Sequence, residues 1–551
     1  MFWRLGYQSL LDPDEAHYAE LTREMMQSGN WLVPLLDGRP FIDKPVFFHW
    51  LQGASVYLLG ESEFAARLPT ALAALALIAM TRWIGTALLG AAVGEWGALM
   101  FATIPATFAL ASIAMFDMTF ALFLFGGVGC LAVAAKEKNR RVEWAGYGLL
   151  TLAVMTKGPV ALVLVGLFLG AAWLASAETR EMVRRLRWKS GLCAVVFGAS
   201  PWFIWMAWRF GPAFVGGYLL AGNIYYFTQP IVFSGRAVSH TYYARVFAGA
   251  FFPWSAVLVG RGIDVLRGRR LGLRLKGEQT LLWLWVFIVI GFFSTARFKL
   301  DHYIFPAAPA CCLLAAHAWR AAAADDERRY RATTFSVIGI AAVLILAGGF
   351  GITYLPQLGL ELPAIALALP VVLMAGGITL MAQSARRNWR LPVNPFVIVT
   401  MLLVVYAIVV AVGFPAIERA RPTSLVAGRL ARVTPASAPV GVYRLERWRA
   451  SLRYYLNRPV ERLETADDMR AFLSRGEPVY VVMLRREYDE LRNAGLPVRV
   501  LIQHRAVVGT SGRGLRRQRW GYLVVVTNRP RETSLALQDD PPADRTPIPA
   551  P

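Results

Sequence analysis

Long apolar segments recur along most of this chain, and they constrain its fold more than any other feature. A helix that crosses a bilayer needs about twenty mostly apolar residues, and such segments follow one another from residue 65 to residue 414. Hydrophobic residues make up 56% of the sequence, more than the roughly 45–50% that is typical of soluble domains. The sequence therefore predicts a polytopic α-helical membrane protein.

The positions of these segments predict about twelve membrane-spanning helices. A shorter apolar stretch, residues 46–60, precedes the first span and is predicted to be a helix at the membrane interface. The predicted spans are residues 65–86, 92–108, 112–135, 143–157, 159–177, 190–209, 246–261, 279–296, 303–319, 333–354, 363–383 and 393–414.

Basic residues are concentrated in alternate loops between the spans. By the positive-inside rule these loops are cytoplasmic, and they explain most of the net charge of +22. No nucleic-acid recognition module is visible, so nucleic acid is not a predicted partner. The opposite set of loops, which includes residues 12–45, 210–245 and 297–302, is predicted to face the outside. The basic loops are residues 136–141, 180–189, 261–276, 320–331 and 386–390.

The pattern changes after about residue 418, where alternating β-rich runs are separated by helical segments. The runs are PVGVYRLE, VYVVML, VRVLIQH and GYLVVVT, and the helical segments are DDMRAFLSR and EYDELRNAG. They predict a small α/β domain on the outer face. The predicted organisation is a first outer loop with interfacial helices (1–64), a transmembrane domain (65–417), the α/β domain (418–530) and a disordered, Pro-rich tail (531–551).

The first outer loop, residues 12–45, gathers charged side chains in an otherwise apolar chain. Carboxylates beside a bilayer usually persist because a reaction, an ion or a partner charge needs them, so this loop is the candidate active site. A further carboxylate, Asp117, lies near the outer end of the predicted span 112–135. Asp117 should meet a cation or remain neutral, since an unpaired buried charge costs several kcal/mol. A purely structural salt bridge is the competing interpretation.

Basic residues from distant turns fall on the same predicted face as this loop. Lys44, Lys157, Arg297 and Lys299 could surround a phosphate with positive charge, with Tyr303 nearby in sequence. The competing interpretation is that each lysine extends its ammonium to the lipid headgroups. The hypothesis of a phosphate site rests on all of them sharing one face.

A carboxylate beside a phosphate-binding set suggests a specific chemistry. If a polyprenyl-phosphate sugar enters from the bilayer, the lysines neutralise the departing phosphate and a carboxylate takes the proton from an acceptor hydroxyl. The sugar then moves by direct displacement, with inversion at its anomeric carbon. Asp14 is the predicted base, and Asp12, Glu15 and Glu20 remain as alternatives.

This chemistry requires no cofactor. Asp43 and His240 are residue types that bind a divalent metal ion, but two such residues are weak evidence, and a plain hydrogen bond is the favoured interpretation.

Several motifs together resemble a known superfamily. DPDEAHYAE at 12–20, IDKP at 42–45, the intramembrane Asp117, Lys-Gly-Pro at 157–159 and KLDHYIFP at 299–306 are similar to the bacterial aminoarabinose transferases of lipid A. They also resemble the wider GT-C superfamily of membrane glycosyltransferases, which includes the protein O-mannosyltransferases. The resemblance implies a GT-C fold with one transmembrane helix more than the twelve predicted, so a first helix is expected upstream of this sequence.

The resemblance also implies roles for individual residues. Asp14 matches the catalytic acid of the first outer loop, Lys44 the lysine that contacts the donor phosphate, and Asp117 a second functional acid. Lys157, Lys299 and Tyr303 would line the lipid-phosphate or sugar pocket, and Arg297 lies in the same turn as the last two. His17 is a further candidate for binding the donor phosphate or sugar. The chain departs from the pattern at three places: His17 stands where close relatives often have Arg, Asp43 replaces a Glu, and KLDHY replaces Lys-Leu-Pro-x-Tyr.

The implied activity is that of an inverting glycosyltransferase at the periplasmic face of the bacterial inner membrane. Its donor would be a sugar on undecaprenyl phosphate, with 4-amino-4-deoxy-L-arabinose as the leading candidate, and its acceptor lipid A or another envelope molecule. A protein O-mannosyltransferase-like activity is the alternative within the superfamily. From another class, a lipid-linked sugar transporter or flippase would need ionisable residues deep in several helices, whereas Asp117 is the main one here.

Overall fold

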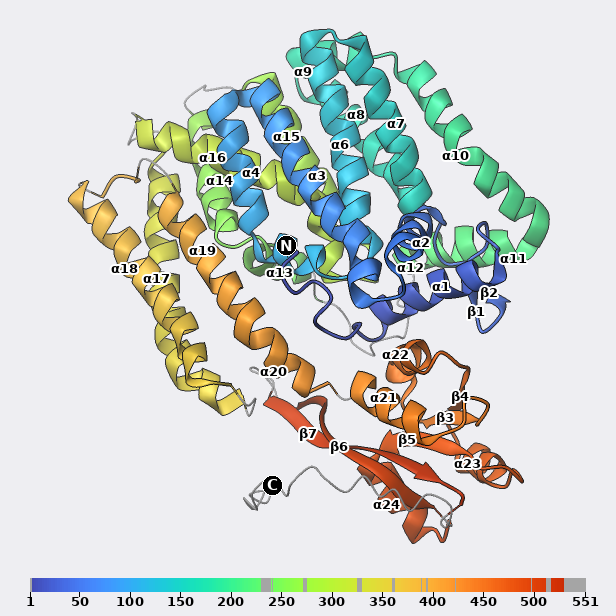
Figure 1. The fold of residues 1–551 in the computed structure, drawn as a ribbon. Helices are drawn as coiled ribbons and strands as arrows, with labels where there is room; N and C mark the ends of the chain where they lie inside the picture. The colour runs from blue at the N-terminus through green and yellow to red at the C-terminus, as the bar shows by residue number, and fades with distance from the viewer. Residues whose placement is uncertain are drawn as a thin grey trace. The chain divides into compact units, whose positions relative to one another are not determined.

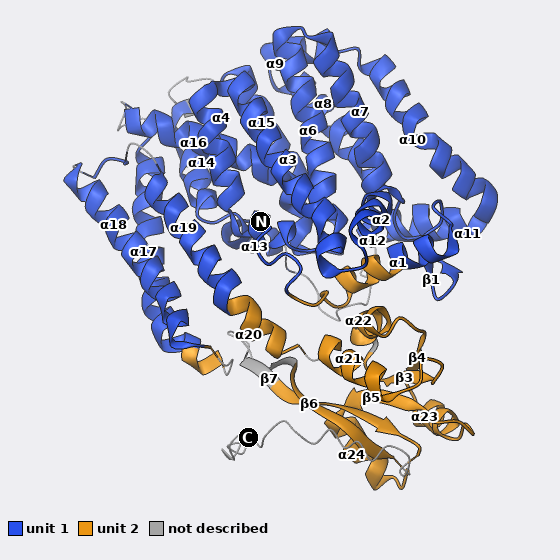
Figure 2. Cartoon of the chain, in the orientation of Figure 1, with its two compact units in different colours: residues 1–7, 21–355, 363–412 blue, residues 8–20, 356–362, 413–551 orange. Residues whose placement is uncertain are grey.

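The structure is a computed structural model that divides the chain into two units (Figures 1 and 2). Unit 1 comprises residues 1–7, 21–355 and 363–412, and unit 2 comprises residues 8–20, 356–362 and 413–551. The first outer loop is thus shared between the two units. The predicted disordered tail, 531–551, lies outside the described residues. The residues that the structure describes are 2–228, 239, 241–270, 275–324, 330–358, 362–387, 389–392, 395–421, 423–496, 498–511 and 517–529.

Helices of unit 1 occupy the positions of all the predicted spans. Among the described residues, seven helices are long and apolar enough to cross a membrane, or up to nine if two bent pairs each count as one span. The chain is a multi-pass membrane protein, and the count of twelve crossings stays a prediction. The helices at the predicted positions are α3 (Glu63–Leu89), α4 (Ala91–Thr103), α5 (Pro105–Ala111), α6 (Phe116–Glu137), α7 (Arg140–Lys157), α8 (Val160–Ala175), α10 (Trp188–Phe210), α13 (Tyr242–Ala250), α14 (Trp254–Arg270), α15 (Gly277–Thr295), α16 (Ala308–Ala324), α17 (Arg331–Tyr354), α18 (Ala368–Arg386) and α19 (Phe396–Ile408).

Shorter elements connect these helices. The π-helix η1 and the 3-10 helix η2 matter for the site described below. The connecting elements are α9 (Ala177–Arg185), α11 (Pro212–Phe214), η1 (Val215–Tyr225), α12 (Tyr226–Thr228), η2 (Asp301–Ala307), η3 (Leu355–Leu358), η4 (Ala364–Leu367) and η5 (Val409–Gly413).

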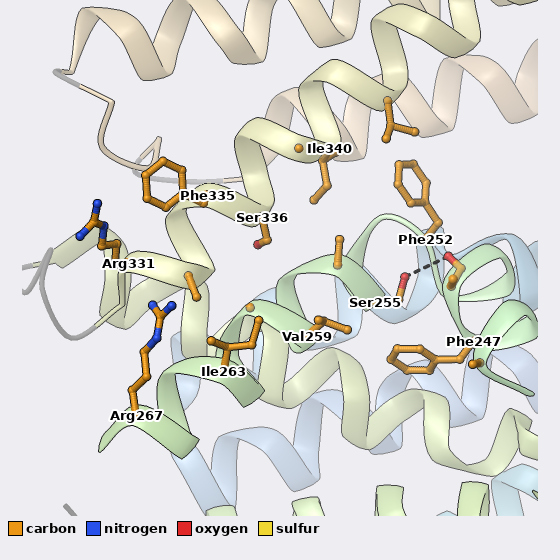
Figure 3. Close-up of a pocket in the computed structure, with 17 residues that line it drawn as sticks. Phe247, Phe252, Ser255, Val259, Ile263, Arg267, Arg331, Phe335, Ser336 and Ile340 are labelled. Carbon is orange, nitrogen blue, oxygen red and sulfur yellow. Dashed lines mark hydrogen bonds between the residues drawn. The ribbon is translucent and has the colours of Figure 1, made fainter. Parts of the chain in front are cut away.

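The predicted span at 246–261 is broken in the structure. Helix α13 ends at Ala250, α14 begins at Trp254, and the two helices are bent by 116°. Pro253 stands at this break, where its missing N–H and the restriction on the preceding residue interrupt a helix. After the bend α14 runs beside α17, and apolar residues from both helices line a groove (Figure 3).

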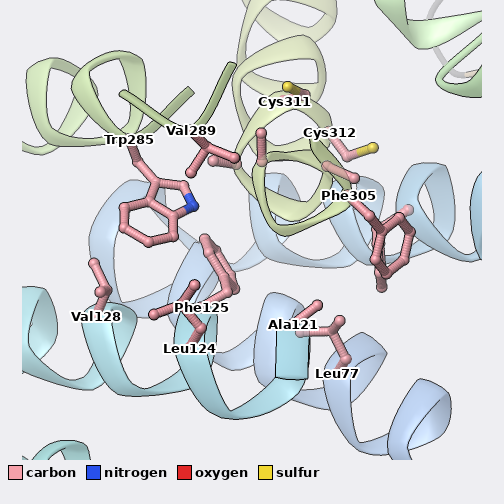
Figure 4. Close-up of a cluster of buried hydrophobic side chains, with 14 of the residues drawn as sticks. Leu77, Ala121, Leu124, Phe125, Val128, Trp285, Val289, Phe305, Cys311 and Cys312 are labelled. Atoms are coloured by element: carbon pink, nitrogen blue, oxygen red, sulfur yellow. The ribbon is translucent and has the colours of Figure 1, made fainter. Parts of the chain in front are cut away.

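Helix α6 is almost wholly buried among its neighbours. Small residues allow this close approach: a Cβ atom at Gly129 would lie 2.1 Å from Ile84 of α3, and one at Gly127 would lie 2.7 Å from Leu150 of α7. Figure 4 shows Leu124 of α6 in one apolar cluster with Trp285 of α15. This packing fixes the start of α6, which carries Asp117.

In unit 1, the first outer loop contains a short hairpin that side-chain hydrogen bonds stabilise. The hairpin of β1 (Leu35–Leu36) and β2 (Arg39–Pro40) is held by Glu24, whose carboxylate accepts hydrogen bonds from the backbone N–H groups of Asp37 and Gly38, both at 3.0 Å. The predicted helix at 46–60 is present as α2 (Phe47–Leu59). Asp43 and Lys44 therefore lie between two fixed elements.

Unit 2 contains the predicted α/β domain. Its five-stranded sheet has the order β4-β3-β5-β7-β6, with β3 parallel to β4 and β5, and β7 antiparallel to β5 and β6. Apolar clusters cover both faces of the sheet. The elements are β3 (Val440–Tyr443), β4 (Val460–Leu463), β5 (Tyr480–Leu484), β6 (Arg499–Ser511) and β7 (Arg517–Thr527), with α20 (Phe414–Arg419), α21 (Thr423–Val433), α22 (Glu446–Leu456), α23 (Ala466–Leu473) and α24 (Arg485–Asn493).

Candidate active site

Asp117 meets Lys157 in a buried ion pair. Asp117 lies in the first turn of α6 and Lys157 is the last residue of α7; because these consecutive helices are packed together, the start of one lies beside the end of the other. Asp117 Oδ1 is 2.5 Å from Lys157 Nζ, and the two side chains are only 2% and 10% exposed. Asp117 thus meets a cation, which is one of the two outcomes expected from its position.

The second oxygen of Asp117 is available to a further donor. His302 Nε2 lies 3.6 Å from Asp117 Oδ2, beyond hydrogen-bond distance. Within the described ranges, Asp117 Oδ2 is buried and accepts no hydrogen bond. A buried carboxylate oxygen without a donor is costly, and a hydroxyl or amino group of a ligand could satisfy it.

Aromatic rings surround the Lys157 ammonium. Its Nζ lies 4.7 Å from the ring centroid of Tyr303, 5.3 Å from that of Phe120 and 5.6 Å from that of Phe116. The negative faces of such rings attract a cation and exclude water from it. Lys157 is therefore held as a fixed positive charge, and it does not extend to the lipid headgroups.

The Lys-Gly-Pro turn packs against Tyr218, which was not among the predicted site residues. Gly158 has a φ of +87°, and a Cβ atom there would lie 2.0 Å from the Tyr218 hydroxyl. This hydroxyl is buried and has no hydrogen-bond partner among the residues that the structure describes. Burial, and then the charge of Asp43, raise the pKa of Tyr218, so its phenol stays protonated and can donate a hydrogen bond.

Asp43 and Lys44 complete this group. Lys44 Nζ lies 3.1 Å from Asp43 Oδ2, with 21% of the Lys44 side chain exposed. The charge of Lys44 acts on both Asp117 and Lys157, which places all three in one electrostatic environment. We call Asp43, Lys44, Asp117, Lys157, Tyr218, His302 and Tyr303 the Lys157 site; all of them belong to unit 1.

The turn that carries Arg297 and Lys299 makes other contacts. Lys299 is buried and its ammonium donates a hydrogen bond to the backbone carbonyl of Ala296. Burial lowers the pKa of Lys299. The Arg297 side chain is exposed. The Lys299 contact stays within its own turn, and a role of either residue in phosphate binding stays a prediction.

The acids of the first outer loop differ in their surroundings within unit 2. Asp12 Oδ2 accepts a hydrogen bond of 2.5 Å from Ser451 Oγ, and Glu20 Oε1 accepts one of 2.8 Å from Arg453 Nε. Glu15 is fully buried and accepts the N–H of Leu11 at 2.8 Å.

Asp14, at the start of α1 (Asp14–Ser28), is exposed. This exposure favours Asp14 over the three competing acids as the residue that can reach a substrate. His17 stacks edge-on against Tyr18, with ring centroids 6.0 Å apart. The predicted meeting of Asp14 with the Lys157 site joins the two units and stays a prediction.

The predicted metal pair is not tested. His240 lies outside the described residues. Within the part of the chain that is described, no group of three or more His, Cys, Asp or Glu side chains could hold a metal ion.

Comparisons with known proteins agree with the motifs. Residues 43–205 match the family model for dolichyl-phosphate-mannose-protein mannosyltransferase, a segment that contains both Lys44 and Lys157. Curated relatives are named undecaprenyl phosphate-α-4-amino-4-deoxy-L-arabinose arabinosyl transferase. The protein from Serratia proteamaculans is 29% identical over 362 residues, 63% of this chain and 62% of its own length. The protein from Pectobacterium atrosepticum is 30% identical over 379 residues, 64% of each chain. The chain thus matches less than two thirds of the length of these relatives.

The structural comparison extends over nearly the whole chain. The crystal structure of ArnT from Cupriavidus metallidurans bound to undecaprenyl phosphate superimposes with a TM-score of 0.73 at 22% identity, covering 96% of both chains. The same protein in the apo state gives a TM-score of 0.72. The resemblance predicted from the motifs is confirmed at the level of the fold: this chain has the GT-C fold of membrane glycosyltransferases, with a small α/β domain at its C-terminal end.

Proposed function

We propose that the chain is an inverting glycosyltransferase that takes a sugar from a polyprenyl-phosphate donor. The names of the curated relatives and the undecaprenyl phosphate bound to ArnT support this donor class. The names of the relatives favour 4-amino-4-deoxy-L-arabinose as the sugar, and the resemblance of the motifs favours lipid A as the acceptor. The basic loops favour an orientation in which the Lys157 site faces the periplasm.

The observation that carries this proposal is the Lys157 site itself. It holds the ammonium group of Lys157 at the end of a membrane helix and that of Lys44 in the loop before α2, both in a largely buried environment. An ammonium has three donors, and the Asp117 contact uses one of those on Lys157. The remaining donors of Lys157 and the more exposed Lys44 can bind a phosphate oxygen, as the departure of a phosphate requires. Asp117 then acts as a positioning residue for Lys157.

The proposed step is a single displacement. A lone pair of the acceptor hydroxyl attacks the anomeric carbon while the bond from that carbon to the phosphate oxygen breaks. The hydroxyl proton passes to the carboxylate of Asp14, and the electron pair of the broken bond remains on the polyprenyl phosphate. Lys44 and Lys157 stabilise the charge that develops on the phosphate, and the anomeric configuration inverts.

A second candidate differs only in the acceptor. The matched family model describes transfer of mannose to protein, so a protein O-mannosyltransferase-like activity is the alternative. Both candidates share the donor class and the same use of the Lys157 site.

Reconstitution of the purified protein distinguishes these candidates. The protein is supplied with undecaprenyl-phosphate aminoarabinose or polyprenyl-phosphate mannose, together with lipid A or peptide acceptors, and the products are identified by mass spectrometry. We expect sugar on lipid A from the aminoarabinose donor. No transfer from any polyprenyl-phosphate donor would reject the proposal.

Substitution of Lys44 tests the phosphate site directly. Lys44→Met should lower the transfer rate by about a hundredfold, because the loss of one preorganised charge at a transition state costs about 10²–10³ in rate. The partly exposed side chain should make this change tolerable to the fold. Lys276→Met, which removes an exposed lysine on the opposite predicted face, is the matched control and should leave the rate unchanged. Equal rates in the two variants would remove Lys44 from the site.

A further inference from the structure

An apolar groove between α14 and α17 is separate from the proposed active site. It encloses about 1070 Å³, at the upper end of the roughly 300–1,000 Å³ of ligand pockets. Its lining is mostly aliphatic and aromatic, as Phe252, Val259, Phe335 and Ile340 illustrate (Figure 3). No residue of the Lys157 site contributes to it.

The two helices are fixed against each other at one end of this groove. Asp264 of α14 accepts hydrogen bonds from the backbone N–H groups of Ala332 and Thr333, both at 2.9 Å, and from Thr333 Oγ1 at 2.7 Å. A Cβ atom at Gly260 would lie 2.7 Å from the Ala332 carbonyl oxygen. Farther along α17, a Cβ atom at Gly339 would meet nothing within 4 Å. The groove therefore lies between two helices that hydrogen bonds and close packing fix against each other.

Two arginines stand at the end where the helices are fixed. Arg267 and Arg331 line the groove, and Figure 3 shows both guanidinium groups at its same end. Both side chains are exposed, and among the described residues neither forms an ion pair with a carboxylate within 4.0 Å. The groove thus joins a long apolar wall to a pair of positive charges.

The dimensions match one leaflet of a bilayer. From Ser255 to Arg267, α14 rises by about 18 Å, and α17 rises equally from Arg331 to Val343. Half of the hydrocarbon core of a bilayer is about 15 Å thick. The basic loops that contain Arg267 and Arg331 are those predicted to be cytoplasmic, so the groove would open along the cytoplasmic leaflet.

We propose that this groove binds an anionic phospholipid of the cytoplasmic leaflet. One acyl chain lies between α14 and α17, and Arg267 and Arg331 hold the phosphate of the headgroup. Each guanidinium group can donate two parallel hydrogen bonds to phosphate oxygens. The positive charges of Arg267 and Arg331 complement an anionic headgroup, so they favour an anionic lipid over a neutral one. A polyprenyl-phosphate donor at the Lys157 site would carry its phosphate at the opposite membrane face. The lipid site therefore does not depend on the proposed function.

Native mass spectrometry of the full chain, released from bilayers of equal phosphatidylglycerol and phosphatidylcholine with identical acyl chains, tests this site. We expect wild-type protein to retain one phosphatidylglycerol in preference to phosphatidylcholine. Arg267→Gln with Arg331→Gln should lower that retention about thirtyfold, given an attraction of about 1 kcal/mol per basic residue for an anionic surface. The matched control is Arg320→Gln with Arg386→Gln, which removes two exposed arginines of predicted cytoplasmic loops that do not line the groove and should have no effect.

A groove-filling variant tests the position of the acyl chain. Gly339→Leu should also lower the retention, because its side chain enters the groove. Gly349→Leu is the control, since Gly349 lies on the same helix, also meets nothing within 4 Å and does not line the groove.

Three results would overturn the proposal: equal retention of the two phospholipids, equal loss in the control variants, or retention of a polyprenyl phosphate that Gly339→Leu displaces. A dimer that Gly339→Leu dissociates would also overturn it, because the groove would then be an interface between two copies of the chain.

Discussion

Substitution of Asp117 by Asn gives the sharpest structural prediction. The change keeps the size of the side chain and removes the negative charge. The Lys157 ammonium then lies among aromatic rings without a counter-charge, on a side chain that is only 10% exposed. Breaking a buried ion pair from one side costs about 3–5 kcal/mol. The positive charge of Lys44, which acts on Lys157, adds to the repulsion. We therefore expect Asp117→Asn to lower the free energy of unfolding by about 3 kcal/mol.

A double variant separates stability from activity. Asp117→Asn combined with Lys157→Met removes both charges, and the flexible Met side chain can pack against the surrounding rings. Replacing a whole buried ion pair by uncharged groups is often nearly neutral, so the double variant should recover to within about 1 kcal/mol of the wild type. Sugar transfer should be lost in Asp117→Asn, because Lys157 loses the carboxylate that positions it. It should stay lost in the double variant, because the phosphate then lacks the charge of Lys157.

The assay is unfolding in mixed detergent and dodecyl sulfate micelles, followed by tryptophan fluorescence, alongside transfer in liposomes. The difference between the double variant and the sum of the two single variants gives the coupling energy of the pair. A cost below 1 kcal/mol for Asp117→Asn, or a double variant no more stable than either single variant, would refute the buried pair. Full transfer activity in the double variant would refute the role of Lys157.

Two further predictions concern the turn that follows Lys157. Gly158→Ala should destabilise the protein by more than about 1 kcal/mol and displace Tyr218, because the new Cβ would lie 2.0 Å from its hydroxyl at a φ of +87°. The control Gly148→Ala, at an open position of α7, should be neutral or slightly stabilising; equal melting temperatures of the two variants would contradict the expected clash. Tyr218→Phe removes only a buried hydroxyl without a described partner, so it should leave the unfolding free energy within about 1 kcal/mol. If the hydroxyl binds donor or acceptor, transfer should fall about tenfold, and an unchanged rate would assign Tyr218 to packing alone.

The arrangement of the elements could be predicted from the sequence where one local property decides it. Length and apolarity placed the helices of unit 1, and alternation placed β3, β5, β6 and β7. The strand β4 was missed, because Glu461 and Arg462 interrupt its apolar pattern. The 116° bend between α13 and α14 was also missed, since Pro253 shows that a helix is interrupted and does not show the direction in which the chain continues.

The site could be predicted only in part, for a related reason. A buried carboxylate must find a cation, so the sequence predicted that Asp117 needs a partner, and Lys157 was already a candidate on the same face. Tyr218 could not be predicted, because it is one of many aromatic residues and only the packing of η1 against Gly158 makes its hydroxyl significant. Conversely, Lys299 was predicted to lie in the same pocket as Lys157, yet its ammonium donates to the Ala296 carbonyl.

The central claim is that an exposed acid near the amino terminus and the lysines of the Lys157 site serve one transfer reaction. The most direct measurement is the amount of transferred sugar, and its anomeric configuration, formed from an undecaprenyl-phosphate sugar by purified wild-type protein and by Asp14→Asn at equal folded concentration. Wild-type protein should form the inverted product, and Asp14→Asn should form less than about 1% of it, the loss expected when a general base is removed. Equal product from both proteins, or product with retained configuration, would contradict the account.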